Sequence, residues 1–151
     1  MKRHEALYPL SHHHHHALVN AVELKKAGTE KSKKSLQQLR RDVIDFWEKD
    51  GRDHFRDEEE VLLPLYARYA SVDQKPIAEM LIQHIQIRGR IQAIRDQEKV
   101  NADQFRELGE LLETHVRLEE RTIFPMIEEV VPEKYLHQAN GKFHRDSVSG
   151  K

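Results

Sequence analysis

A stretch that occurs twice constrains the fold of this chain more than any other feature. Residues 54–64 read HFRDEEEVLLP and residues 115–125 read HVRLEERTIFP, with a His, an Arg, two Glu and a Pro at matching offsets. An internal repeat of this length is rarely chance in a chain without low-complexity sequence elsewhere. Side chains four residues apart stack on one face of a helix, so each copy offers a metal ion one imidazole nitrogen and one carboxylate oxygen.

Two such copies on facing helices would supply about half of the ligands of a metal site. The alternative is a duplicated helix end with solvated His and Glu, because polar pairs at this spacing are common on helix surfaces. The position of the apolar residues decides between the two interpretations, since a polar side chain inside an apolar stripe is costly unless it is paired or bound to a metal.

Composition narrows the class of protein. A length of 151 residues suits one domain, and the absence of Cys excludes disulfides, thiolate zinc sites and cysteine nucleophiles. A formal net charge of −1 gives no electrostatic reason to expect a nucleic-acid partner. Neither a signal-peptide pattern nor an apolar run near the ~20 residues of a membrane helix is present, so we expect a cytoplasmic protein without membrane contact.

The first expected helix contains the histidine run His12–His16, which flows directly into Ala17. At about 100° per residue, one face of this helix carries Leu10, Ala17, Leu18, Ala21 and Val22, and His14 lies nearest its centre. His15 comes next, on the side of Val22. We expect His12, His13 and His16 to face solvent.

Three further helices are expected, each with polar residues inside its apolar stripe. The second opens at Ser32 or Ser35 and buries Leu36, Leu39, Val43, Phe46, Trp47, His54, Glu58, Val61 and Leu65. The third has Pro76 in its first turn and buries Ile77, Met80, Leu81, His84, Ile87, Ile91 and Ile94, with Arg88 one turn after His84. The fourth opens near Asp103 and buries Phe105, Leu108, Leu111, Leu112, His115, Glu119, Ile123 and Met126.

The prediction for the whole chain is therefore an all-α domain over residues 1–131, an up-down antiparallel four-helix bundle, followed by a tail or short helix over 132–151. The six candidate metal ligands on the inward faces are His14, His54, Glu58, His84, His115 and Glu119. Nitrogen and oxygen ligands without sulfur favour iron, manganese or zinc. One zinc needs only about four ligands, so six candidates indicate two ions with the carboxylates able to bridge them.

These residues resemble the hemerythrin-like family, also called HHE cation-binding domains. The resemblance is carried by the first-helix His, His54-x-x-x-Glu58, His84 and His115-x-x-x-Glu119, with the flanking Glu-Glu and Leu-Pro or Phe-Pro, and it spans roughly residues 8–131. It implies an up-down four-helix bundle around a non-heme di-iron centre, two iron ions bridged by two carboxylates and an oxo or hydroxo group. It also implies a small ligand, dioxygen, peroxide or nitric oxide.

The sequence departs from the oxygen-carrying members of that family. They have His-x-x-x-His on the third helix, whereas His84 has Met80 before it and Arg88 after it at this distance. If each iron takes roughly six ligands, about ten of twelve positions are filled here and one more is open than in the carriers. For Arg88 we expect a side chain that extends outward along its helix, rather than a cation beside the metals.

Three functions fit these residues. The first is a di-iron protein that binds or reacts with oxygen species. The second is an iron sensor or store, in which metal binding stabilises the bundle and a protein partner, which the sequence does not identify, reads the folded state. The third is a partner-binding helical module that carries zinc or no metal. Metal content and an absorption spectrum separate the three.

Overall fold

The structure, a computed structural model, describes residues 3–144, and these residues form helices without any strand. The first rod comprises a 3-10 turn η1 (Glu5–Leu7) and α1 (Tyr8–Lys25). The second comprises α2 (Leu36–Phe46), η2 (Trp47–Gly51), α3 (Arg52–Asp57), η3 (Glu58–Leu62) and α4 (Leu63–Ala67). The third is α5 (Lys75–Asp96), and the fourth comprises α6 (Ala102–Leu118), η4 (Glu119–Ile123) and α7 (Phe124–Val130). A short helix α8 (Glu133–Asn140) follows.

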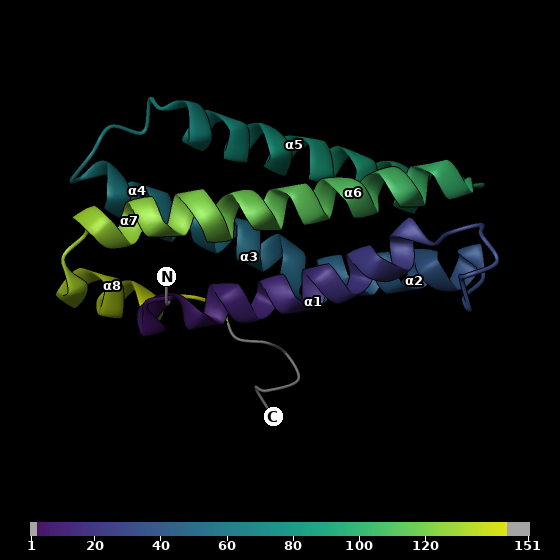
Figure 1. Ribbon diagram of the computed structural model, residues 1–151, viewed down its shortest axis with the longest axis horizontal. Coiled ribbons are helices and arrows are strands. Elements are labelled where there is room, and N and C mark those ends of the chain that lie inside the picture. Colours follow the sequence, from purple (N-terminus) through teal and green to yellow (C-terminus); the bar gives the residue numbers. More distant parts are fainter. Residues whose placement is uncertain (1–2, 145–151) are drawn as a thin grey trace.

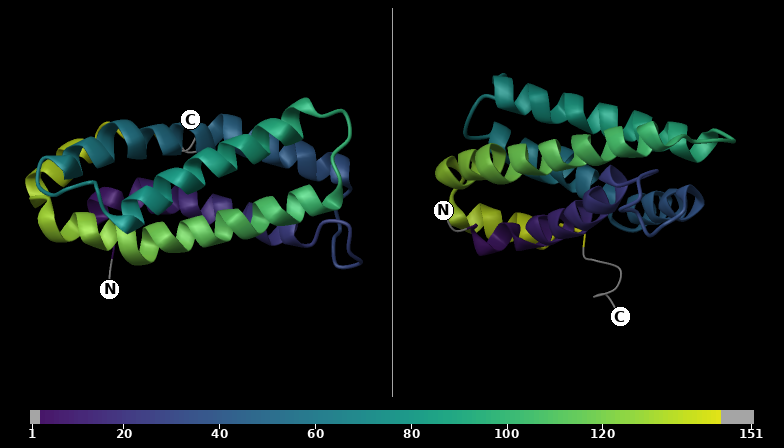
Figure 2. Two further views of the ribbon diagram at one scale, coloured as in Figure 1. Left: turned by 90° about the horizontal axis from the view of Figure 1, so that it is seen from above. Right: turned by 45° about the vertical axis from the view of Figure 1, so that its right-hand side comes forward.

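The rods lie side by side (Figures 1 and 2). α1 contacts both α2 and α6, and α5 also contacts both α2 and α6, so the rods close a ring around a shared interior. In Figure 1 the loops after α1 and α5 lie at one end of the molecule, and the loop after α4 lies at the other. α8 turns back at that second end and packs against η1, where Asn140 Nδ2 donates to the carbonyl of Ala6 at 2.8 Å.

Local sequence signals set where the rods begin and end. Ser35 caps α2 by accepting from the backbone N–H of Gln38, which selects Ser35 from the two predicted starts. Asn101 and Gln104 form a capping box at the start of α6. Gly28 ends the first rod with φ of 72°, a conformation that a side chain would strain.

The interior consists of two apolar clusters with a polar layer between them. One cluster contains Leu10, Met80 and Ile123, and the other contains Leu24, Ile87 and Leu112. Along each of α1, α5 and α6, the buried histidine lies between residues of these two clusters. The polar layer is thus enclosed by apolar packing above and below it. Of the described helices, none is long and apolar enough to cross a membrane.

The chain after the fourth rod was predicted as a tail or a short helix. Residues 133–140 are helical as α8, and the chain then runs back along the bundle as far as His144. Residues 145–151 of the predicted tail lie outside the described residues. The division into a bundle over 1–131 and a separate end over 132–151 stays a prediction.

Candidate metal centre

Both copies of the repeat contain a π-helical turn that begins at the first glutamate of the pair. The N–H of Leu63 donates to the carbonyl of Glu58, and that of Phe124 donates to the carbonyl of Glu119. Pro64 and Pro125 follow immediately. A proline has no N–H, and its ring would clash with the carbonyl four residues earlier, so the ordinary helical pattern is blocked at the same place in both copies. π turns within α-helices are rare and occur frequently at functional sites.

The π turns explain why the predicted buried residues are partly wrong in both copies of the repeat. Each wide turn adds a residue, so the buried positions after it move by one relative to a regular α-helix. Leu62 is fully buried while Val61 is only half-buried. In the fourth rod, Ile127 is buried while Met126 is half-buried. Before the turns, the predicted stripe is right at His54 and His115, both of which are buried.

The structure brings the six candidate side chains together in two adjoining groups. One group contains His14, His54, Glu58 and Glu119, and the other contains Glu58, His84, His115 and Glu119. Within each group the potential ligand atoms lie within 4.8 Å of one another, and every member is buried. α1, the second rod, α5 and the fourth rod each contribute, so the cluster occupies the centre of the bundle.

The two glutamates are shared by both groups, with one oxygen toward each. Glu119 Oε1 lies 2.7 Å from His14 Nε2 and 3.6 Å from His54 Nε2. Its Oε2 lies 3.2 Å from His84 Nε2 and 3.0 Å from His115 Nε2. Glu58 repeats the arrangement, with Oε2 2.9 Å from His54 Nε2 and Oε1 3.0 Å from His84 Nε2. This is the disposition of two bridging carboxylates between two cation positions.

Several of these inward atoms have no hydrogen-bond partner among the described residues. They are both carboxylate oxygens of Glu58 and the Nε2 atoms of His54 and His115. An unsatisfied buried polar group costs about 1–3 kcal/mol, and more when it is charged. Cations at the two positions would satisfy these atoms at once, and a donor set of imidazole nitrogen and carboxylate oxygen suits iron, manganese or zinc. The residues therefore fit a pair of metal ions.

Two of the inward histidines are held from behind by the second glutamate of each repeat. His14 Nδ1 lies 2.6 Å from Glu120 Oε2, and His84 Nδ1 lies 2.6 Å from Glu59 Oε2. A carboxylate in this position keeps the hydrogen on Nδ1 and directs the lone pair of Nε2 inward. Glu59 and Glu120 flank the candidate ligands Glu58 and Glu119 in the sequence, and this supporting contact was not predicted for them. The doubled Glu in both copies was the signal that could have identified them.

The other two histidines have neutral partners. His115 Nδ1 lies 2.8 Å from Gln83 Oε1, and His54 Nδ1 lies 3.1 Å from His13 Nδ1. Burial and the neighbouring His54 and His144 lower the pKa of His13 to about 2, so its ring is neutral. No spacing in the sequence indicated Gln83.

The histidine run is only partly as predicted. His14 is buried within the cluster, and the alternative candidate His15 is exposed. The prediction that His13 faces solvent is wrong, because its ring is buried between His54 and His144. The first helix alone could not reveal this, since His144 comes from the far end of the chain. Val22, predicted on the apolar face, is 48% exposed.

Arg88 makes contact with the cluster only through Glu59. Its guanidinium donates to both oxygens of that carboxylate, at 2.9 and 3.0 Å, and lies over the ring of Phe55 at 5.4 Å. The side chain is partly exposed, in keeping with the predicted outward course, but its bidentate pair with Glu59 was not foreseen. α5 thus supplies His84 to one of the two groups, and Arg88 on the following turn fixes the carboxylate of Glu59 behind it.

Electrostatics follow from this packing of histidines against carboxylates. Burial lowers the pKa of His84, but the carboxylates of Glu119, Glu58 and Glu59 around it outweigh this effect and raise that pKa to about 11. Burial also lowers the pKa of His54, but the charge of the neighbouring Glu58 outweighs this effect, and the pKa is raised to about 10. Burial alone would raise the pKa of Glu119, yet the charge of His115 and hydrogen bonds from the histidines hold it well below its usual value.

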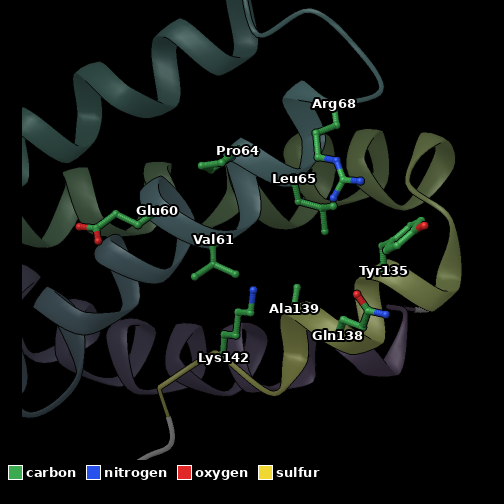
Figure 3. A pocket seen from close by; sticks show the side chains of 9 residues that line it. All are labelled: Glu60, Val61, Pro64, Leu65, Arg68, Tyr135, Gln138, Ala139 and Lys142. Atoms are coloured by element: carbon green, nitrogen blue, oxygen red, sulfur yellow. The ribbon is translucent and has the colours of Figure 1, made fainter.

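A surface pocket between α4 and α8 is separate from this cluster. It encloses about 250 Å³ and is lined by Glu60, Val61, Pro64, Leu65, Arg68, Tyr135, Gln138, Ala139 and Lys142 (Figure 3). None of the six candidate ligands lines it. The pocket therefore gives no reason to move the candidate site.

Comparison with known proteins identifies the family of the chain. Comparison with curated proteins found no match. The model of the hemerythrin HHE cation-binding domain matches residues 7–127, a span that contains both groups and nearly all of the four rods. Because the match covers most of the chain, and the buried His and Glu within it form positions for cations, the chain belongs to the hemerythrin HHE cation-binding domain family.

Proposed function

We propose that this protein is an up-down antiparallel four-helix bundle that holds a non-heme di-iron centre and reacts with a small oxygen species. The ligands are His14 and His54 for one ion, His84 and His115 for the other, and Glu58 and Glu119 as bridges. One observation carries the proposal: each bridging glutamate directs one oxygen to each group. A single ion would need only one of the two groups.

The chain's own residues set the chemistry that the centre can support. Bound ferrous iron would supply electrons and open coordination positions to dioxygen, peroxide or nitric oxide. Each group offers its ion four ligand atoms, fewer than the roughly six that iron takes. α5 contributes only His84. Glu59, Glu120, Gln83 and His13 hold the histidine rings in place. The apolar clusters on both sides limit the access of water.

Metal counting tests the proposal. Tag-free protein loaded with iron should contain two ions per chain. Glu58→Ala or Glu119→Ala should lose both ions, because each carboxylate reaches both positions. Glu60→Ala is the matched control, an exposed glutamate of the same repeat, and should keep both. One zinc ion in protein isolated without added metal, together with failure to retain iron, would refute the di-iron assignment.

Reaction with air tests the chemistry separately from the metal count. Because both iron positions have room for an external ligand, we expect the reduced, iron-loaded protein to oxidise rapidly in air. Stopped-flow absorption after mixing with oxygen measures this. A stable spectrum that reverts when oxygen is removed would contradict the expectation and favour a reversible oxygen carrier.

A further inference from the structure

A second cluster of potential metal ligands lies behind His54, outside the two groups already described. It consists of His13 from α1, Asp50 from η2 and His144 from the segment after α8, and their potential ligand atoms lie within 4.8 Å of one another. His13 and Asp50 are buried, and His144 is half-buried. Residues from the start, the first third and the end of the chain thus converge at one place, and none of them is a candidate ligand of the di-iron centre.

The carboxylate of Asp50 is incompletely satisfied. Its Oδ1 is buried and accepts no hydrogen bond from any described residue, although His144 Nε2 lies 3.4 Å away. Its Oδ2 lies 3.3 Å from His16 Nδ1. A buried carboxylate oxygen without a partner is destabilising. A cation among the three side chains would satisfy it.

The local backbone is shaped to form this cluster. The π turn η2 places Asp50 inward on the second rod, and Gly51 is required beside it, because an added Cβ would lie 2.8 Å from the ring of Trp47. The end of the described chain is fixed across the rod, where the backbone N–H of His144 donates to Asp57 Oδ2 at 2.5 Å. Asp53 Oδ2 lies 3.6 Å from His144 Nδ1, so further negative charge surrounds the position.

We propose that His13, Asp50 and His144 form a third metal position that takes a divalent cation of the zinc and iron class. Two imidazoles and one carboxylate are a common protein ligand set for such ions, with solvent in the remaining position. His144 Nε2, which lies 2.9 Å from the carbonyl of Lys49, would exchange this contact for a metal bond or bind through Nδ1. The proposal does not depend on the di-iron assignment, since the two ligand sets have no residue in common.

The third position is coupled to the pair through one hydrogen. The Nδ1 atoms of His13 and His54 lie 3.1 Å apart, and only one of them can carry the hydrogen between them. His54 binds metal through Nε2 with the hydrogen on its own Nδ1, and His13 likewise needs the hydrogen on its own Nδ1 to bind through Nε2, so the two rings compete for one hydrogen. Filling the pair keeps the hydrogen on His54 and so opposes metal binding through His13 Nε2, and the third position is therefore tested in protein that lacks the pair.

The test counts zinc in full-length protein that lacks the pair. We expect Glu119→Ala to retain one zinc ion per chain, and Asp50→Asn or His144→Gln in that background to lose it. The controls are Asp45→Asn and His15→Gln, which change exposed side chains of the same two rods and should leave the zinc in place. Circular dichroism of each variant establishes that it is folded.

A second measurement covers the case in which Glu119→Ala does not fold. Zinc added to metal-free, otherwise unaltered protein should slow hydrogen exchange at the His144 amide, and should not do so in Asp50→Asn. Two results would overturn the third position: zinc content that neither Asp50→Asn nor His144→Gln changes, or equal loss in His15→Gln, which would assign the zinc to the histidine run. Neither result bears on the pair, which is counted with iron in protein that keeps Glu119.

Discussion

At the residue scale, the histidine run offers the sharpest contrast between neighbouring side chains. His14 is buried against Glu119, whereas His15, the next residue, is exposed. We expect His14→Ala to lose about one iron ion per chain, because it removes a ligand from one group only, and His15→Ala to lose none. Metal analysis of tag-free protein measures both. Loss of iron in His15→Ala with retention in His14→Ala would show that the first helix is rotated from the orientation described.

Glu59 has a supporting role that can be separated from direct ligation. It accepts from His84 Nδ1 and is held by Arg88, and these neighbours lower its pKa to about 2 against the opposing effect of burial. Loss of a carboxylate behind a metal-bound histidine typically weakens metal binding 10–100-fold. We expect Glu59→Gln to show about this loss in an iron competition assay, with Glu60→Gln unchanged. Unaltered affinity in Glu59→Gln would show that the carboxylate serves packing alone.

The histidine pKa values predict how metal binding depends on pH. Metal binds only the unprotonated Nε2, yet the raised pKa values of His54 (about 10) and His84 (about 11) keep both rings protonated at pH 7 in the metal-free protein. Binding must therefore release protons, and affinity should rise with pH through the neutral range. Calorimetry in buffers of different ionisation enthalpy measures the release. Binding without proton release would contradict the protonated state.

The raised pKa of His84 also determines whether the metal-free protein becomes more or less stable as pH rises. In the unfolded chain a histidine titrates near pH 6.5. Since folding raises the pKa of His84 to about 11, the stabilisation by its protonated form is fully present below pH 6.5 and is lost as pH rises toward 11. Denaturant unfolding of metal-free protein should accordingly show falling stability at alkaline pH.

At the scale of the helical element, the prolines of the repeat fix the π turns. Replacing Pro64 or Pro125 by Ala restores a backbone N–H and removes the clash with the preceding turn, so the helix can tighten into regular α form. This would rotate the segments before and after Glu58 or Glu119 relative to each other. We expect lower iron content with unchanged or higher helix content by circular dichroism. Iron retention equal to that of the unaltered protein would mean that the histidine and glutamate packing holds the turn open without proline.

The π turns also explain which parts of the fold the sequence could predict. Regular α periodicity places His84 and His115 correctly, because each lies on an unbroken α-helical segment, and it places His54 correctly although the π turn η2 precedes it. The same periodicity selects Val61 where Leu62 is buried, because a helical stripe assumes one fixed rotation per residue. Contacts that depend on another rod, such as His13 against His144, have no periodic signal. The candidate ligands were therefore accessible from sequence, whereas most side chains behind them were not.

At the scale of the whole molecule, metal should contribute strongly to stability. A ligand that binds only the folded state stabilises it by about 4 kcal/mol when its free concentration is 1,000 times the dissociation constant. For a domain of this size, each kcal/mol raises the melting temperature by about 2–4 °C, so iron loading should raise it by roughly 8–16 °C. Differential scanning calorimetry of loaded and metal-free protein measures the change. A Glu58→Ala protein should show little of this increase, and a full increase there would place the stabilising metal elsewhere.

The sharing of the glutamates has a consequence for how the two halves of the chain are joined. Each half supplies one histidine from its first rod and one His–Glu pair from its second, so the molecule has the layout of two helical hairpins fused into one chain by residues 68–74. Each group takes both histidines from one hairpin and one glutamate from the other. The proposed metals thus lie between the two halves of the chain, and neither metal position can be completed by one half alone.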